Sequence, residues 1–137
     1  MAQRISKSTL AVWAAVIIGS GLLVWQAQRS AVPDSVVQVA VPAFSSEAKA
    51  GRAVFEESCK VCHGDNAAGS SNGPPLVHVI YEPNHHADFS FELAVKRGVR
   101  AHHWGYGNMP PVGGLTDNQI GRVTAYIREL QRANGIN

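Results

Sequence analysis

Two cysteines and a histidine stand together in Cys59-Lys60-Val61-Cys62-His63, and the chain holds no other cysteine. Thiols three positions apart are separated by about one helical turn, and the adjacent imidazole adds a nitrogen ligand. These groups suit covalent attachment, disulfide exchange or metal binding. A secreted disulfide scaffold would have more cysteines at wider spacings, so that class is excluded.

The C-x-x-C-H spacing is the attachment signal for haem c. The two thiols add to the two vinyl groups of one porphyrin, and His63 binds the iron from the proximal side. A thioredoxin-like C-x-x-C needs a βαβ context, which the sequence lacks. A Cys2His2 zinc site needs a histidine pair a few residues apart, whereas His78 and His85 are too widely separated and His85 and His86 are adjacent. The sequence therefore predicts one covalently bound haem c.

Three segments have the apolar spacing and capping residues of helices: Glu47–Cys59, Phe89–Arg97 and Asp117–Ala133. Ser45 or Ser46 can cap the first, Gly98 stops the second, and Thr116 with Gln119 forms a capping box before the third. Loops rich in glycine and proline occupy residues 64–75 and 105–114, and no segment predicts a sheet. Short helices and long loops bury little apolar surface, so we expect a large apolar cofactor to fill the core.

From Ala48 to the C-terminus the chain resembles the class I cytochromes c, the small mono-haem family. Gly51 and Phe55 match the family's N-terminal helix, which crosses a C-terminal helix at a contact expected here from Tyr126. The resemblance implies an all-α fold of three to four helices around one covalently bound haem. It also implies electron transfer to and from redox protein partners, with no enzymatic activity and no small-molecule substrate.

The resemblance extends to two loops that border the haem. Gly73-Pro74-Pro75-Leu76 matches the loop after the attachment signal, which implies that the Pro75 carbonyl accepts a hydrogen bond from His63 and that Leu76 packs on the porphyrin. The segment Gly107–Pro110 matches the one that supplies the distal thioether, so Met109 is the expected second iron ligand. The only other methionine is Met1.

The remaining histidines and the residues before Met109 leave alternatives open. His78 is alone, whereas His85-His86 and His102-His103 are adjacent pairs. They can be surface groups, some of them bonded to a haem propionate, or His102 or His103 can replace Met109 as the axial ligand. The pairs can also bind copper or zinc. Trp104 and Tyr106 carry polar ring groups that suit haem propionates.

Residues 10–27 carry no charge and follow a basic segment containing Arg4 and Lys7. As a helix, eighteen residues rise about 27 Å, which is close to the thickness of a bilayer core. A cleaved signal peptide is the alternative, but cleavage after Ala27 or Ala31 would place Trp25 or Arg29 three residues before the cut. The segment predicts one N-terminal transmembrane helix with a cytoplasmic N-terminus.

These observations divide the chain into a membrane anchor (1–27), an extended linker (28–45) and a cytochrome c domain (46–137). The haem domain is expected on the periplasmic side of a bacterial inner membrane. A net charge of +2 gives no reason to expect nucleic acid as a partner. We predict a membrane-tethered carrier between a respiratory or photosynthetic donor complex and a terminal oxidase or reductase. The alternative is a fixed haem c subunit of a larger membrane-associated oxidoreductase.

Overall fold

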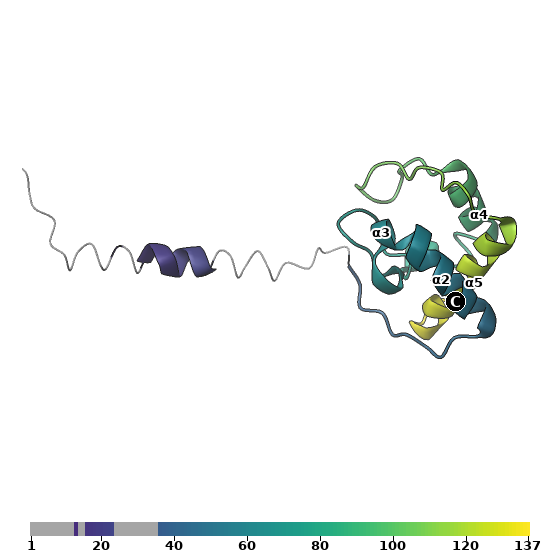
Figure 1. The fold of residues 1–137 in the computed structure, drawn as a ribbon, viewed down its shortest axis with the longest axis horizontal. Coiled ribbons are helices and arrows are strands. Elements are labelled where there is room, and N and C mark those ends of the chain that lie inside the picture. The colour runs from purple at the N-terminus through teal and green to yellow at the C-terminus, as the bar shows by residue number, and fades with distance from the viewer. Residues whose placement is uncertain (1–12, 14–15, 24–35) are drawn as a thin grey trace, which may run out of the picture. The chain divides into compact units, whose positions relative to one another are not determined.

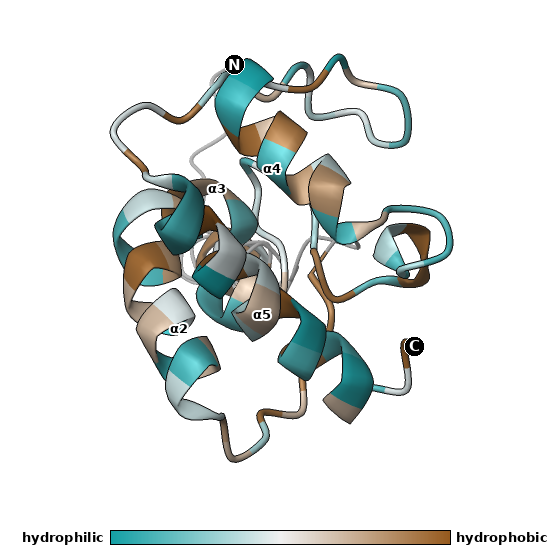
Figure 2. Ribbon diagram, turned by 90° about the vertical axis from the view of Figure 1, so that its right-hand side faces the viewer, coloured by the Kyte–Doolittle hydropathy of each residue, from teal (hydrophilic) through white to brown (hydrophobic). Residues whose placement is uncertain are grey.

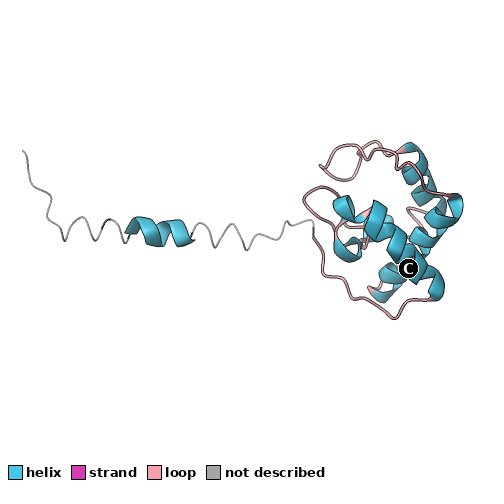
Figure 3. Ribbon diagram, viewed as in Figure 1, coloured by secondary structure: helices cyan, strands magenta, loops and turns pink. Residues whose placement is uncertain are grey.

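Helices and loops make up the whole of the chain that the computed structural model describes, which is residue 13, residues 16–23 and residues 36–137 (Figure 3). Within these ranges no strand forms, and the only β pairing is an isolated bridge between Val99 and Met109. The all-α prediction is therefore confirmed for the described residues. The chain divides into two units, residues 1–32 and 33–137, and each is described by itself.

The first unit is described at Trp13 and at residues 16–23, which are helical and exposed. Ser20 donates its hydroxyl to the carbonyl oxygens of Val16 (2.8 Å) and Ile17 (3.1 Å) along the same helix. Over the residues that can be described, no helix is both long enough and apolar enough to cross a membrane. The rest of the predicted anchor, residues 1–27, lies outside the described residues.

The second unit contains four α-helices and two 3-10 turns: α2 (Ser46–Ser58), α3 (Lys60–His63), η1 (Asp65–Ala67), η2 (Val79–Tyr81), α4 (Asp88–Arg97) and α5 (Asp117–Ala133). The bounds of α5 are as predicted, and its capping box between Thr116 and Gln119 is present. Helices α2 and α4 each begin one residue before the expected start, and Ser45 is the N-cap of α2. Gly98 follows α4 with a φ of +74°, a left-handed conformation that glycine adopts without strain.

Helix α2 packs against α5, and Gly51 sets how close the two helices lie (Figure 1). A Cβ atom at this position would lie 1.8 Å from the Arg122 carbonyl oxygen, so only glycine fits. Further along α2, the rings of Phe55 and Tyr126 pack with their centroids 5.4 Å apart. The prediction that this helix crosses the C-terminal helix at a contact made by Tyr126 is confirmed, because Tyr126 of α5 packs on Phe55 of α2.

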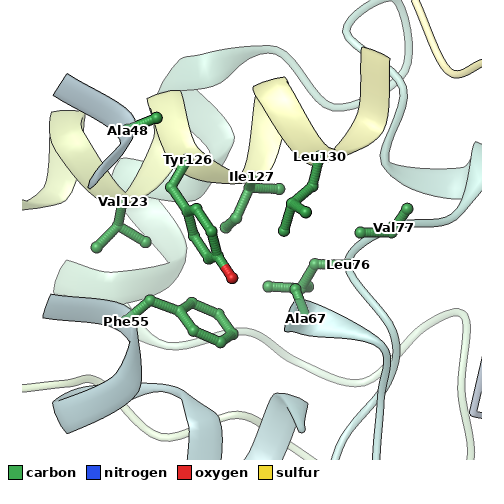
Figure 4. Packing of buried hydrophobic residues seen from close by; sticks show 9 residues of the cluster. All are labelled: Ala48, Phe55, Ala67, Leu76, Val77, Val123, Tyr126, Ile127 and Leu130. Atoms are coloured by element: carbon green, nitrogen blue, oxygen red, sulfur yellow. The ribbon is translucent and has the colours of Figure 1, made fainter. Parts of the chain in front are cut away.

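The apolar core lies between α2, α5 and the loop that follows the haem-attachment motif (Figure 4). Tyr126, Ile127 and Leu130 project from α5 toward Phe55 of α2. Leu76 and the buried Ala67 complete this cluster from the loop side. In Figure 2, apolar residues of α2 and α4 alternate with hydrophilic ones along each helix, the pattern of helices with one buried face. This core fixes the orientation of α2, and therefore of the motif that follows it.

The segment before α2 packs on the domain. Val37, Val39 and Phe44 contact the core cluster, and the Val37 amide donates to the Ala68 carbonyl oxygen at 2.9 Å. The Asn134 side chain bonds both backbone groups of Ala40. Residues 36–45 are thus extended and attached to the second unit, while residues 28–35 of the predicted linker lie outside the described residues.

Candidate haem-binding site

The Cys59–His63 motif forms a single helical turn directly after α2. The Cys59 amide bonds the Phe55 carbonyl oxygen at 2.8 Å, which ends α2, and the His63 amide bonds the Cys59 carbonyl oxygen at 3.0 Å. Cys59 is half-buried and Cys62 is exposed, and the two thiols are not joined in a disulfide. Because the turn is attached to α2, the helix crossing with α5 sets the position of both thiols.

The His63 imidazole is buried and has a fixed tautomer. Its Nδ1 lies 2.9 Å from the Pro74 carbonyl oxygen. A carbonyl only accepts, so Nδ1 donates and Nε2 keeps its lone pair. Burial lowers the pKa of His63, although the Pro74 carbonyl acts in the other direction. The residue is therefore held as a neutral imidazole, which is the form that binds a metal.

The accepting carbonyl belongs to Pro74, one residue before the predicted Pro75. Gly73 packs against the backbone of Cys62, where a Cβ atom would lie 2.9 Å from the Cys62 carbonyl oxygen. This close approach brings the next carbonyl in the chain, that of Pro74, to the imidazole. Pro75 is fully buried in the core, and Leu76 follows it.

A cavity of about 290 Å³ opens beside His63. Its size is near the lower limit of about 300 Å³ for ligand pockets in proteins. Five of the predicted site residues line it: Cys59, His63, Leu76, Trp104 and Met109. Most of the other lining side chains are apolar, among them Phe55, Phe91, Val95, Ile120 and Ile127. The structure thus brings these five residues to one apolar space, and their roles stay predictions.

Met109 is held at the cavity by a bridge that the sequence did not predict. Its amide and carbonyl groups exchange hydrogen bonds of 2.9 Å with those of Val99. Gly98 allows this approach, because a Cβ atom there would lie 2.5 Å from the Met109 carbonyl oxygen. The glycine was recognised from the sequence only as a helix stop. Its second function depends on a contact with a residue eleven positions later, which periodicity does not reveal.

Trp104 offers a hydrogen-bond donor that lacks an acceptor. Its Nε1 is buried and has no acceptor at full hydrogen-bond geometry among the described residues; the closest interaction is with the Tyr81 hydroxyl, where the indole N–H opposes the burial that raises the pKa of Tyr81. A buried N–H without a partner costs about 1–3 kcal/mol, so such groups are usually satisfied by a ligand or water. A carboxylate at the cavity wall, such as a haem propionate, would satisfy it.

Tyr106 does not offer its hydroxyl hydrogen to the cavity, as the sequence had suggested for a propionate. The hydroxyl donates instead to the Ser70 carbonyl oxygen at 3.1 Å.

The Cys59 thiol is in an environment that disfavours its ionised form. Burial, and to a smaller extent the neighbouring Cys62, raises the pKa of Cys59 to about 11. Disulfide-exchange enzymes and zinc sites need a thiolate and therefore lower the pKa of their cysteines. A thioether formed with a vinyl group is neutral and suits this buried position. The cavity, the neutral His63 and the unpaired Trp104 N–H together fit a haem.

The sequence also did not reveal what fixes the loop between η2 and α4. Arg128 of α5 is buried and donates to the carbonyl oxygens of Tyr81 (2.7 Å) and His86, and its Nε pairs with Asp88 at 2.7 Å. Gln131 donates to the Leu76 carbonyl oxygen at 2.8 Å. Both residues lie on the α5 face that packs inward. A charged residue within an apolar helix pattern was the available signal.

The histidines other than His63 gather near the same cavity. His86, His102 and His103 are among its lining residues, and the His78 ring contacts Trp104 with a centroid distance of 5.0 Å. His102 and His103 therefore remain alternatives to Met109 as the second iron ligand. Partial desolvation, together with the imidazoles of His102, His86 and His85, lowers the pKa of His103.

Comparison with known proteins identifies a family for the part of the chain just described. Residues 48–131 match the family model for cytochrome c. The match begins in α2, includes the Cys59–His63 motif and ends in α5. No curated protein and no solved structure matches the chain.

Proposed function

Because this chain belongs to the cytochrome c family, which binds haem c covalently and transfers electrons through it, we propose that it is a class I electron carrier with His63 and Met109 as iron ligands. When bound, haem c supplies a one-electron couple between ferric and ferrous iron. The chain supplies two thiols for attachment at Cys59 and Cys62. It also supplies the neutral Nε2 of His63 and the thioether of Met109.

The proposal rests on one observation: His63 and Met109 both line the same cavity. With haem bound, His63 and Met109 would both hold the iron and would leave no position on it for oxygen or peroxide. A thioether ligand also raises the reduction potential relative to a second imidazole. Both effects favour electron transfer over catalysis on the iron.

The attachment motif offers an exposed edge for electron exchange. Cys62 is exposed, and the Val61 side chain between the two cysteines is 74% exposed. An exposed apolar residue beside a cofactor edge suits brief docking of a partner protein. We assign this edge to contact with a donor complex and with a terminal oxidase or reductase.

We also propose that residues 1–27 hold the chain in a bacterial inner membrane, with the haem domain on the periplasmic side. The uncharged run of residues 10–27 supports this, as do the exposed apolar side chains of Ile17 (67%) and Leu23 (70%). The intact protein should fractionate with membranes and retain Met1 or Ala2 at its N-terminus. A mature protein that begins near Gln28 would overturn the anchor.

A fixed subunit of a larger oxidoreductase is the second candidate. Besides Val61, the domain exposes Val79 (60%) and Phe89 (62%), and a permanent partner would cover such side chains. Purification of the intact chain in mild detergent separates the two candidates. A carrier is recovered alone, whereas a subunit is recovered with the same partner proteins in fixed proportion.

A redox titration of the purified protein tests electron transfer itself. We expect one transition that involves a single electron, and no binding of carbon monoxide to the reduced protein. Rapid binding of carbon monoxide to the unmodified chain would instead indicate an open iron site, as in a haem sensor or an oxidase.

A further inference from the structure

Four histidines from two separate segments meet at the edge of the haem cavity. His85 and His86 lie in the turn before α4, and His102 and His103 lie in the loop between Val99 and Met109. The ring centroids of His85 and His103 are 5.4 Å apart, and so are those of His86 and His103. Nitrogen atoms of His85, His86 and His103 all lie within 4.8 Å of one another. Three imidazoles at this spacing can reach a common ion.

The tautomer of His86 is set for metal binding. Its Nδ1 lies 2.6 Å from the Ile80 carbonyl oxygen and therefore donates to it. The Nε2 lone pair remains available. Histidines that bind metals usually donate the second ring N–H to a carbonyl or carboxylate, which orients the ring and raises the basicity of the binding nitrogen. The structure already provides this contact.

Both segments are fastened close to the cluster. Arg128 donates to the backbone carbonyl of His86 and pairs with Asp88, which fixes the turn before α4. Burying an arginine is costly unless its donors are satisfied, and here each guanidinium nitrogen has an acceptor. The other loop is closed at its base by the Val99–Met109 bridge. The imidazoles are therefore brought together by contacts within the protein that do not depend on an ion.

We propose that His85, His86 and His103 bind one divalent transition-metal ion, copper or zinc, through one ring nitrogen each. Neutral imidazole is a preferred ligand of both metals, and a site with three nitrogen ligands binds copper(II) more tightly than zinc(II). Three protein ligands leave a position for water or for a donor ligand that delivers the ion.

The proposed ion would lie beside the haem, because His86 and His103 also line the haem cavity. A second positive charge there favours the ferrous state over the ferric state, since the ferric haem carries one more positive charge. Metal occupancy should therefore raise the reduction potential of the haem. The site would connect the availability of a metal ion to the tendency of the haem to accept an electron.

Metal binding can be measured on the haem-loaded, full-length chain in detergent, without a polyhistidine tag. In this form Cys59 and Cys62 are consumed in thioethers and cannot compete for the ion. Calorimetric titration with Zn²⁺ and with Cu²⁺ should give one ion per chain, with copper bound more tightly. The copper-loaded protein should show hyperfine coupling to imidazole nitrogens in its electron paramagnetic resonance spectrum. The absence of stoichiometric binding would overturn the proposal.

Three histidine variants identify the ligands. His85→Ala and His103→Ala each remove one ligand, and each should weaken binding by about tenfold or more. His102→Ala is the matched control, because it is exposed and adjacent to His103 but outside the group of three. It should leave the affinity within about twofold. Unchanged affinity in both ligand variants, or loss of binding only in the control, would overturn the assignment.

The haem itself reports whether these histidines serve a separate ion. With Met109 as the second iron ligand, as proposed above, the haem absorption spectrum should be the same in all three variants. A changed spectrum in His103→Ala would make that residue an axial ligand and overturn the proposal. Zn²⁺, which has no redox chemistry, should raise the haem potential of the unmodified chain but not of His85→Ala. Equal potentials with and without Zn²⁺ in the unmodified chain would contradict the placement beside the haem.

Discussion

The two sides of the haem cavity are built in different ways. Residues 59–76, the proximal wall, are connected by short backbone hydrogen bonds, such as Gly69 N–H to the His63 carbonyl oxygen and Leu76 N–H to the Ala67 carbonyl oxygen, both 2.8 Å. His63 and Leu76 are buried in this wall. The main chain itself therefore fixes the attachment side.

Residues 98–112, the distal wall, are fixed mainly at their base. The Val99–Met109 bridge closes the loop, and Val112 N–H bonds the Val95 carbonyl oxygen at 2.8 Å. Between them the chain is largely exposed and depends on side-chain contacts, such as Ala101 N–H to Asn108 Oδ1 at 2.9 Å. The proximal wall is thus suited to permanent attachment. The distal wall is where changes of sequence can adjust the proposed second iron ligand and the histidine cluster without unfolding the domain.

The largest effect is expected from losing both thioethers on the proximal wall. In Cys59→Ala with Cys62→Ala the cavity of about 290 Å³ would be left without its covalent filling. The apolar side chains that line this space would then face water, and a small domain has only about 5–15 kcal/mol of stability to lose. Haem staining on a denaturing gel should be lost, and circular dichroism should show loss of helix.

Single substitution of Cys62 is the control for that experiment, because one thioether remains at Cys59. It should keep covalent haem and most of the helical signal. A double variant that is haem-free yet well folded would show that the core does not need the cofactor.

Removing Met109 should change the redox chemistry and leave the fold intact. Met109→Ala should lower the reduction potential, abolish the near-infrared sulfur-to-iron band and allow carbon monoxide to bind the reduced protein. Met109→His should keep six ligands and still lower the potential, because imidazole stabilises ferric iron better than a thioether does. If His102 or His103 is the ligand, Met109→Ala will leave the spectrum unchanged and substitution of that histidine will alter it.

Gly98 provides a smaller perturbation of the distal wall. In Gly98→Ala the positive φ with an extended ψ of 178° costs about 1–3 kcal/mol, and the new Cβ atom meets the Met109 carbonyl oxygen. We expect a weakened sulfur-to-iron band and a lower thermal midpoint. Gly113→Ala is the control, since nothing lies within 4 Å of a Cβ atom there. An unchanged band in Gly98→Ala would mean that the bridge does not position Met109.

The equivalent change on the proximal wall is Gly73→Ala, whose Cβ atom would lie 2.9 Å from the Cys62 carbonyl oxygen. It should reduce the yield of covalently attached haem and leave the sulfur-to-iron band of the attached fraction unchanged. This pair of glycine variants separates attachment from distal ligation. If Gly98→Ala and Gly73→Ala weaken the sulfur-to-iron band equally, the proximal and distal walls are not independent in positioning Met109.

The smallest effect is expected from Trp104→Phe, which keeps a smaller aromatic ring and removes the buried N–H. If this group donates to a propionate, its loss should destabilise the haem-loaded protein by about 1 kcal/mol. It should also lower the reduction potential slightly, because the propionate charge is then less well balanced. Thermal unfolding and a redox titration check both outcomes. If the thermal midpoint and the reduction potential are both unchanged, the Trp104 N–H donates to water and not to a propionate.

Much of the local structure could be predicted from the sequence. The capping box at Thr116 and Gln119 and the bounds of α5 agree with prediction, because capping and helical periodicity involve residues a few positions apart. The hydrogen bond of His63 was placed one residue too late, at Pro75. Two consecutive prolines give the same local signal, and only the packing of Gly73 on Cys62 distinguishes their carbonyl groups.

The sequence alone determined the chemistry of attachment, because the Cys59–His63 spacing is contained within one turn of chain. The family resemblance carried by Gly51 and Phe55 also indicated the crossing of α2 and α5, and the structure shows why position 51 admits only glycine there. Tertiary structure alone decided the Val99–Met109 bridge, the buried Arg128 contacts and the meeting of His85, His86 and His103. Each of these joins residues that lie ten or more positions apart, and their distances depend on how the whole chain packs around the cavity.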